Sequence, residues 1–475
     1  MKLKTETFYE NSQAALKDAK LQRAINIFNT RFFDHREKSI GSLDSWDEWR
    51  DEARKIKART INRLDEYLEL LVEQVTKAGG IVHFSKDAED ARNYIAELAK
   101  ARGVKLVVKG KSMTTEEIGL NEFLEEAGVE AVETDLGEYI VQLAGETPAH
   151  IIAPAIHKTR QDVGELFADK LGVEYSEEVE KLIKIARRQL REKFCNAQMG
   201  ITGVNFAVAE TGTIVIVENE GNARLSTSLP PIHVALMGIE KVIPTMEDLA
   251  VFLRVLPRSA SGQKMSSYVS FITGPRRALE EDGPEELHLV ILDNGRSRIL
   301  QDEELRESLY CIRCGACLNA CPVYAKIGGH AYGWVYSGPI GSVITPNFVG
   351  LGKAKELPFA SSLCGACKDI CPVRINIPHL LLKMRSKVVE EGEEDAKRRV
   401  PWLERMSFTL WALCMRDRRT YELASRLATL MQRPFVRDGK ITSLPGFLSR
   451  WTNNRDLPPL ASRTFRKRWD DYIGR

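Results

Sequence analysis

Seven of the nine cysteines in this chain fall in two short runs in its carboxyl-terminal half. The runs are Cys311-x-x-Cys314-x-x-Cys317-x-x-x-Cys321-Pro322 and Cys364-x-x-Cys367-x-x-x-Cys371-Pro372. In patterns of this kind the closely spaced thiolates bind one iron–sulfur cluster, and the cysteine before the proline ligates the other cluster of a pair. The sequence therefore predicts two [4Fe–4S] clusters that both runs hold together.

The spacing assigns four thiolates to one cluster and three to the other. The first set is Cys311, Cys314, Cys317 and Cys371, and the second set is Cys321, Cys364 and Cys367. Position 361, where the second run would place its missing cysteine, is Ser361. Cys195 and Cys414 stand alone, and either could instead supply the fourth ligand, although a lone cysteine is more often a small buried apolar side chain.

Zinc and disulfides explain the cysteine pattern less well. Two Cys-x-x-Cys pairs suffice for tetrahedral zinc, so the third cysteine of the first run and the two Cys-Pro ends would be superfluous. The chain begins Met1-Lys2-Leu3-Lys4, without the apolar core of a secretory leader. We therefore expect a cytoplasmic, reducing location in which disulfides are rare.

Length and charge distribution suggest several parts with different partners. A chain of 475 residues is too long for one hydrophobic core, and no apolar run approaches the roughly 18 residues that span a membrane. The net charge is only +2, but residues 397–475 carry 18 Lys and Arg against 7 Asp and Glu, a local charge of +11. This basic tail predicts an acidic partner or surface, and no DNA-reading motif accompanies it, which argues against nucleic acid.

The first 78 residues have the apolar spacing of helices, and Gly79-Gly80 ends that pattern. Short β-rich segments then alternate with amphipathic helices near 88–101 and 115–127. Strands are expected at 81–84, 104–109, 129–133, 205–209, 213–217, 241–243, 267–273 and 287–292. This alternation predicts βαβ units and a mainly parallel sheet.

A second informative stretch runs from residue 200 to residue 233. Two of the expected strands flank a turn at Glu210, and residues 220–233 are predicted to form a polar loop that could bind a small anion. Glu210 and His233 are candidate acid and base groups, but they could equally satisfy buried backbone groups. No Gly-x-Gly-x-x-Gly or Walker lysine is present, so we expect the clusters to pass electrons rather than to receive hydride.

Three segments together resemble the lactate utilization protein B family. They are Gly203-x-Asn205-x-Ala-x-Ala-Glu210-Thr-Gly-Thr213, Leu229-Pro-Pro-x-His233 and the first cysteine run. The resemblance covers nearly the whole chain. It implies an α/β LUD domain at residues 79–297, similar to the sugar isomerase and CoA-transferase fold, after a helical segment at residues 1–78. A helical two-cluster ferredoxin domain at residues 298–390 and a basic helical tail at residues 391–475 would follow.

The resemblance also implies a function. Family members are expected to be cytoplasmic electron-transfer subunits of an L-lactate oxidation complex, alongside A-type and C-type partner proteins. The family tends to have three cysteines in the second run, so Ser361 is no departure from its pattern. An alternative is that the LUD domain itself acts on a small carboxylate, with Glu210 and His233 as acid and base groups and the clusters as internal electron acceptors.

Overall fold

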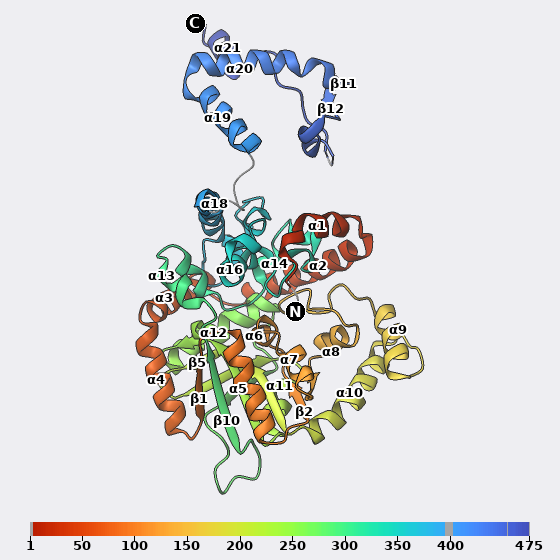
Figure 1. Cartoon of the computed structure of the whole chain (residues 1–475), viewed down its shortest axis with the longest axis vertical. Helices are drawn as coiled ribbons and strands as arrows, with labels where there is room; N and C mark the ends of the chain where they lie inside the picture. Colours follow the sequence, from red (N-terminus) through yellow and green to blue (C-terminus); the bar gives the residue numbers. More distant parts are fainter. Residues whose placement is uncertain (1–2, 395–401, 454, 475) are drawn as a thin grey trace. The chain divides into compact units, whose positions relative to one another are not determined.

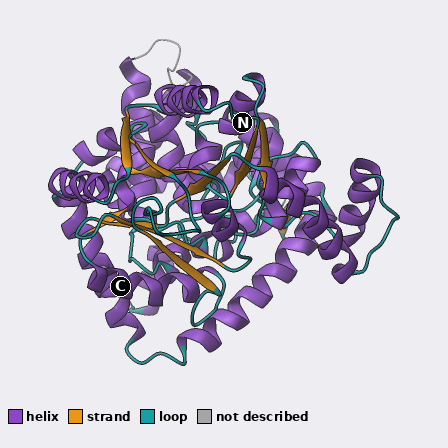
Figure 2. Ribbon diagram, turned by 90° about the horizontal axis from the view of Figure 1, so that it is seen from below, coloured by secondary structure: helices purple, strands orange, loops and turns teal. Residues whose placement is uncertain are grey.

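The computed structural model describes residues 3–394, 402–453 and 455–474. The chain divides into a larger compact unit, Met1–Val388, and a smaller one, Val389–Arg475. Figure 1 labels many of the elements of each unit, and Figure 2 shows that the strands of the larger unit lie in its interior with helices around them.

The larger unit is built on a six-stranded sheet in which all neighbouring strands are parallel. Its order is β1-β10-β7-β4-β2-β3. The strands are β1 (Ile81–Ser85), β2 (Leu106–Lys109), β3 (Glu130–Glu133), β4 (Met199–Gly203), β7 (Ile232–Gly238) and β10 (Glu286–Leu292). Parallel neighbours need crossover connections, which α5 (Ala88–Ala101) and α7 (Leu120–Glu126) help to supply. The predicted α/β class and mainly parallel sheet are confirmed.

A second sheet has four strands in the order β8-β5-β6-β9. They are β5 (Phe206–Val208), β6 (Thr213–Glu218), β8 (Val242–Ile243) and β9 (Tyr268–Ile272). Strands β5 and β6 form an antiparallel hairpin, and Gly212 in their turn has φ of +68°, a value that glycine adopts without steric cost. The remaining helices of the α/β region are α6 (Met113–Glu117), α8 (Leu136–Leu143), α9 (Arg160–Leu171), α10 (Val179–Asn196), α11 (Asn222–Ser228) and α12 (Met246–Ala260).

Helices from both ends of the larger unit complete it. The amino-terminal helices are α1 (Phe8–Lys17), α2 (Ala19–Ile40), α3 (Trp46–Asn62) and α4 (Leu64–Lys77). The cysteine region contributes α13 (Arg296–Gln301), α14 (Ala316–Asn319), α15 (Tyr324–Ile327), α16 (Gly338–Val349), α17 (Ala366–Ile370) and α18 (Ile377–Glu394). One hydrophobic core contains Ile56 of α3, Ile214 of β6 and Leu318 of α14. The cysteine region therefore packs directly on the α/β region.

Two central strands, β4 and β7, are not among the strands predicted from the sequence. Residues 220–233 are not one polar loop: they contain helix α11 and the start of β7, in which His233 lies. Strand β4 contains two glycines, and a Cβ on Gly200 would lie 1.7 Å from the carbonyl oxygen of Ser226 in α11. The close approach of α11 explains why β4 has glycine at position 200, although glycine weakens strands. Strand β7 is buried along its whole length, so it lacks the alternation that reveals a half-buried strand.

The smaller unit is mainly helical, as expected for the tail. It contains α19 (Trp402–Arg416), α20 (Arg418–Met431), a hairpin of β11 (Val436–Arg437) and β12 (Lys440–Ile441), and α21 (Phe465–Tyr472). The beginning of the basic tail, residues 395–401, lies outside the described residues. In the described part of the chain, every helix is too short or too polar to cross a membrane.

Candidate functional site

The two cysteine runs adopt the same local structure fifty residues apart. In the first run Arg313 has φ of +59° and Gly315 φ of +75°, and helix α14 then carries Cys317. In the second run Leu363 has φ of +55° and Gly365 φ of +89°, and helix α17 then carries Cys367. A left-handed backbone is costly for residues other than glycine, such as Arg313 and Leu363, so the repeated conformation indicates a shared role in orienting the thiols.

The first predicted set of cysteines comes together across the two runs. Cys311, Cys314, Cys317 and Cys371 line one small cavity. Burial, followed by repulsion from Cys371, raises the pKa of the Cys314 thiol. Burial also raises the pKa of Cys371 to about 11. Without a cation these thiols stay protonated, whereas a coordinated metal holds them as thiolates.

The second predicted set is also drawn from both runs. Burial raises the pKa of Cys367 to about 12, and the next contributions come from Cys321 and Cys364. Burial raises the pKa of Cys321 as well, and Cys364 adds to that rise. Cys321 and Cys367 are buried, while Cys364 is exposed. The exposed cysteine places the second set nearer to solvent than the first.

Backbone N–H groups already point at several of the sulfur atoms. The amides of Arg313, Tyr324 and Ile375 donate to Sγ of Cys311, Cys321 and Cys371 at 3.4, 3.5 and 3.3 Å. Hydrogen bonds to ligating sulfur tune iron–sulfur clusters. In the described residues, no three His, Cys, Asp or Glu side chains are grouped closely enough to hold one metal ion. A cubane instead offers each thiolate a different iron, so the donor types, their burial and their amide partners fit [4Fe–4S] clusters.

Arg50 of α3 holds the second Cys-Pro turn from the amino-terminal segment. Its Nε and Nη2 donate to the carbonyl oxygen of Cys371 at 3.0 and 2.9 Å, and Nη2 also reaches the carbonyl oxygen of Asp369 at 2.5 Å. The Arg50 residue is buried, and its guanidinium presents several donors in a fixed plane. This contact was missed in the sequence, because nothing local relates a helix near residue 50 to a cysteine at residue 371.

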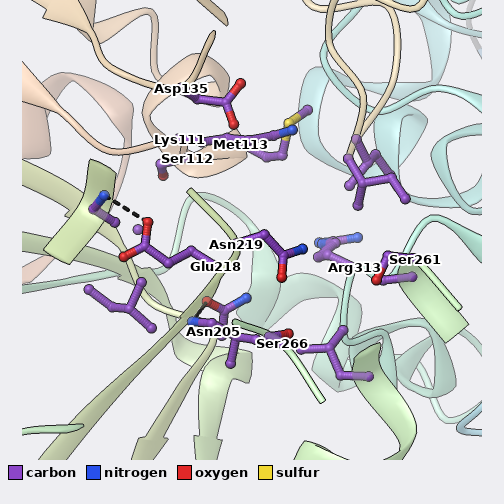
Figure 3. Close-up of a pocket in the computed structure, with 18 of the residues that line it drawn as sticks. Lys111, Ser112, Met113, Asp135, Asn205, Glu218, Asn219, Ser261, Ser266 and Arg313 are labelled. Atoms are coloured by element: carbon purple, nitrogen blue, oxygen red, sulfur yellow. Dashed lines mark hydrogen bonds between the residues drawn. The ribbon is translucent and has the colours of Figure 1, made fainter. Parts of the chain in front are cut away.

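A cavity of about 500 Å³ opens where β2 and β4 end. The residues after β2, Lys111 and Ser112, line it together with Gly203 and Asn205, which end and follow β4. Ligands of open α/β sheets bind at this edge, beyond the carboxyl ends of the strands. Figure 3 shows Arg313 and Ser261 on one side of the cavity and Asp135 and Glu218 on the other.

Lys241 and Arg313, which line the cavity near the first cysteine run, belong to a cluster of buried charges with Glu240 and Arg296. Glu240 accepts a hydrogen bond of 2.6 Å from Nε of Arg296 and a longer one of 3.4 Å from Nη2 of Arg313. Burial raises the pKa of Glu240, but the cations, first Arg296 and then Arg313, outweigh it and hold that pKa at about 2. Burial lowers the pKa of Lys241 to about 8 against the opposing effect of Glu240. Sequence patterns could not single out these residues, because their charges meet only in the folded chain.

Comparisons with known proteins match every part of the chain. Residues 68–292 match the LUD domain model, residues 307–375 the 4Fe-4S dicluster domain model and residues 382–472 the model "Lactate utilisation protein B, C-terminal". Proteins named lactate utilization protein B from Bacillus thuringiensis (strain Al Hakam) and Bacillus cereus (strain AH187) are each 45% identical over 472 residues, which cover 99% of this chain and 98% of the relative. The chain belongs to the lactate utilization protein B family. The resemblance drawn from the motifs is confirmed.

One solved structure adds little to this family assignment. A DUF162 family protein from Deinococcus radiodurans is 12% identical, with 48% of this chain and 98% of that chain covered. The TM-score is 0.28, too low to support an argument about the fold.

In this member of the lactate utilization protein B family, the two candidate acid and base residues lie in different surroundings. Glu210 is exposed and accepts a hydrogen bond of 3.2 Å from the backbone of Met246 at the start of α12. His233 is fully buried in β7, its Nε2 is paired with the hydroxyl of Thr202 at 2.8 Å, and burial lowers its pKa to about 3. Neither residue lines the cavity.

The two lone cysteines of this family member lie in different units. Cys195 is exposed near the end of α10, and Cys414 is partly buried in α19 of the smaller unit. Ser361 lies in the second cysteine loop, and its Oγ accepts a hydrogen bond of 3.1 Å from the amide of Leu363. Of the three candidates for a fourth ligand, Ser361 is the one that shares its loop with Cys364.

Proposed function

We propose that this chain carries two [4Fe–4S] clusters and passes electrons through them in lactate utilization. The observation that carries the proposal is that thiols from both runs lie close together. The first set is Cys311, Cys314, Cys317 and Cys371. The second set is Cys321, Cys364 and Cys367. Similar loops, buried sulfur atoms and amide donors support both assignments.

The family supports a role as an electron-transfer subunit of a cytoplasmic L-lactate oxidation complex with A-type and C-type partners. Oxidation of L-lactate to pyruvate releases two electrons and two protons. Each [4Fe–4S] cluster exchanges one electron, so two clusters match that stoichiometry. In this proposal the LUD domain spans residues 79–297, after the helical residues 1–78, the ferredoxin-type domain spans residues 298–390, and the basic tail, residues 391–475, docks on an acidic partner.

Iron and sulfide analysis tests the cluster content. Anaerobically purified protein is expected to contain about eight irons per chain, or about seven if the corner without cysteine is lost. Cys314→Ser should remove the electron paramagnetic resonance (EPR) signal of the first cluster and Cys364→Ser that of the second, while Cys195→Ser, on the exposed end of α10, should retain both. About one iron per chain, or bound zinc, would contradict the proposal.

A second candidate function is oxidation of a small carboxylate by the LUD domain itself. The observation in its favour is the cavity whose wall includes Arg313, between the cluster ligands Cys311 and Cys314. Glu210 and His233 lie outside this cavity, so they have no support as its acid and base groups. An assay of the purified chain alone with L-lactate and an artificial electron acceptor separates the two candidates, because an electron-transfer subunit is inactive without its partners.

A further inference from the structure

The LUD cavity and the space between the first set of cysteines share a wall. Ile151 and Arg313 line both. The left-handed backbone at Arg313 orients its amide toward Cys311, to which it donates, while its side chain lines the cavity. The guanidinium lies 4.5 Å from the ring centre of Tyr336, which also lines the cavity. One residue of the first cysteine loop therefore belongs to the cavity as well.

The buried guanidinium of Arg313 has few hydrogen-bond partners in the protein around it. Its side chain is 9% exposed, and the contact with Glu240 is long. Within the described part of the chain, its Nε and Nη1 have no hydrogen-bond partner. Glu240 is already engaged by Arg296 at 2.6 Å. A buried cation is stable only when an anion or hydrogen-bond acceptors compensate it.

Lys241 is the second buried cation on this wall. The residue is 9% exposed and lines the cavity. The structure records no ion pair or hydrogen bond for its Nζ among the described residues. Glu240 is the carboxylate with the largest electrostatic effect on Lys241, and it acts in the same way on Lys57. Two cations thus line the cavity, and the carboxylate that acts on both of them, Glu240, is already engaged by Arg296.

We propose that this cavity binds an organic monocarboxylate, with its carboxylate group held by Lys241 and Arg313. The lining also contains Arg31 and Lys111 together with Asp135, Glu218 and Glu220. Four cations thus face three carboxylates, and an excess of one positive charge favours a monoanion over a phosphate dianion. Phe32, Ile151 and Leu256 give the ligand an apolar wall. The volume is in the range of pockets for small organic ligands and leaves room beyond a three-carbon acid.

The site has a consequence for the first cluster, and this consequence rests on the proposed function. Lys241 and Arg313 lie near enough to Cys311 to interact with it electrostatically. A bound carboxylate neutralises part of their charge, so reduction of the first cluster becomes less favourable. By linkage, reduction of that cluster weakens carboxylate binding by the same factor.

Calorimetric titration of the anaerobic full-length protein tests the site, with L-lactate, pyruvate, hexanoate and inorganic phosphate as separate probes. At least one of the three carboxylates is expected to bind once per chain. Lys241→Met should weaken that binding by about 10-fold or more, as for loss of a charge-assisted hydrogen bond. Lys181→Met on α10, whose side chain is 60% exposed, is the matched control and should bind as the unaltered protein does. The bound probe should lower the midpoint potential of the first cluster, and Lys241→Met should abolish that shift.

Three outcomes would overturn the carboxylate site: no binding of any of the three carboxylates, binding of phosphate alone, or equal binding by Lys241→Met and the unaltered protein. Iron content and EPR signals measured on the same samples report the clusters separately. Intact clusters without carboxylate binding overturn this inference alone. Absent clusters overturn the proposed function instead, and carboxylate binding measured on such protein still decides for or against the site.

Discussion

The amide of Leu363 donates a hydrogen bond to Oγ of Ser361, as the amide of Arg313 donates to Sγ of Cys311 fifty residues earlier. The two distances are 3.1 and 3.4 Å, and both donor residues have left-handed backbones. Ser361 thus occupies in the second loop the position that Cys311, a proposed cluster ligand, occupies in the first. Its hydroxyl is therefore our proposed ligand for the open corner of the proposed second cluster.

Ser361→Cys is therefore expected to supply a fourth thiolate and to slow the loss of the second cluster in air. Ser361→Ala should alter the EPR signal of the second cluster and leave that of the first unchanged. Ser362→Ala, at the exposed neighbouring serine, is the control and should alter neither. An unchanged spectrum for Ser361→Ala would mean that serine is not a ligand.

Arg50→Met should destabilise the first cluster, although residue 50 is far in sequence from the cysteines. The substitution removes the buried donors to the carbonyl oxygen of Cys371 and leaves that oxygen unsatisfied, at a cost of about 1–3 kcal/mol. We expect faster loss of the first cluster's EPR signal in air and a lower midpoint of chemical unfolding. Lys55→Met on the same helix, whose side chain is 74% exposed, is the control. Equal rates for the two variants would show that Arg50 does not support the Cys-Pro turn.

Gly200→Ala tests the close packing of α11 on β4. The added Cβ would lie 1.7 Å from the carbonyl oxygen of Ser226, so backbone must move, and we expect a loss of at least about 3 kcal/mol in unfolding free energy. Gly128→Ala is a useful contrast, because its Cβ would meet nothing within 4 Å while φ is +79°. That variant should cost only about 1–2 kcal/mol, from backbone strain. Similar losses in the two variants, measured by chemical unfolding, would contradict the predicted contact.

His233 should make the protein less stable as the pH falls. Burial lowers its pKa from 6.5 to about 3 in the folded chain, so below pH 6.5 the unfolded chain takes up the proton first. The contribution of neutral His233 to the unfolding free energy is complete above pH 6.5. It declines between pH 6.5 and 3, by about 1.4 kcal/mol per pH unit at most. His233→Gln should reduce the loss of unfolding free energy between pH 6.5 and 5 by about 1.5 kcal/mol. A pH dependence of His233→Gln equal to that of the unaltered protein, measured by chemical unfolding, would contradict this prediction.

The basic tail should bind its partner in a salt-dependent way. Residues 397–475 carry a charge of +11, and α19 exposes large apolar side chains that include Trp402, Phe408 and Trp411. Buried aromatic side chains often anchor interfaces, and added salt screens exposed charges. A chain ending at Asp395 should keep its clusters but no longer co-purify with the A-type and C-type proteins, and Trp411→Ala should weaken the complex. Full co-purification of the shortened chain at low salt would refute the docking role.

The sequence was most informative where the chemistry is local. The cysteine runs predicted two sets of thiols, because cluster ligands recur at short fixed spacings, and the four thiols of the first set line one small cavity. The β5–β6 hairpin was predicted around Gly212, but β4 and β7 were missed, since one is rich in glycine and the other is buried at every position and so lacks alternation. Lys241 and Arg313 were not recognised, because a charge becomes unusual only when folding buries it.

The hydrogen bond from Arg50 to the carbonyl oxygen of Cys371 joins residues 321 positions apart. During synthesis the amino-terminal helices emerge long before the second cysteine run exists, so this contact cannot form until most of the chain has been made. In the proposed ligand set, the first cluster also needs Cys371 together with three cysteines of the earlier run. Cluster insertion is therefore a late event in biogenesis, and the newly made chain must keep α1–α4 available, with part of their apolar surface uncovered, until the last ligand arrives.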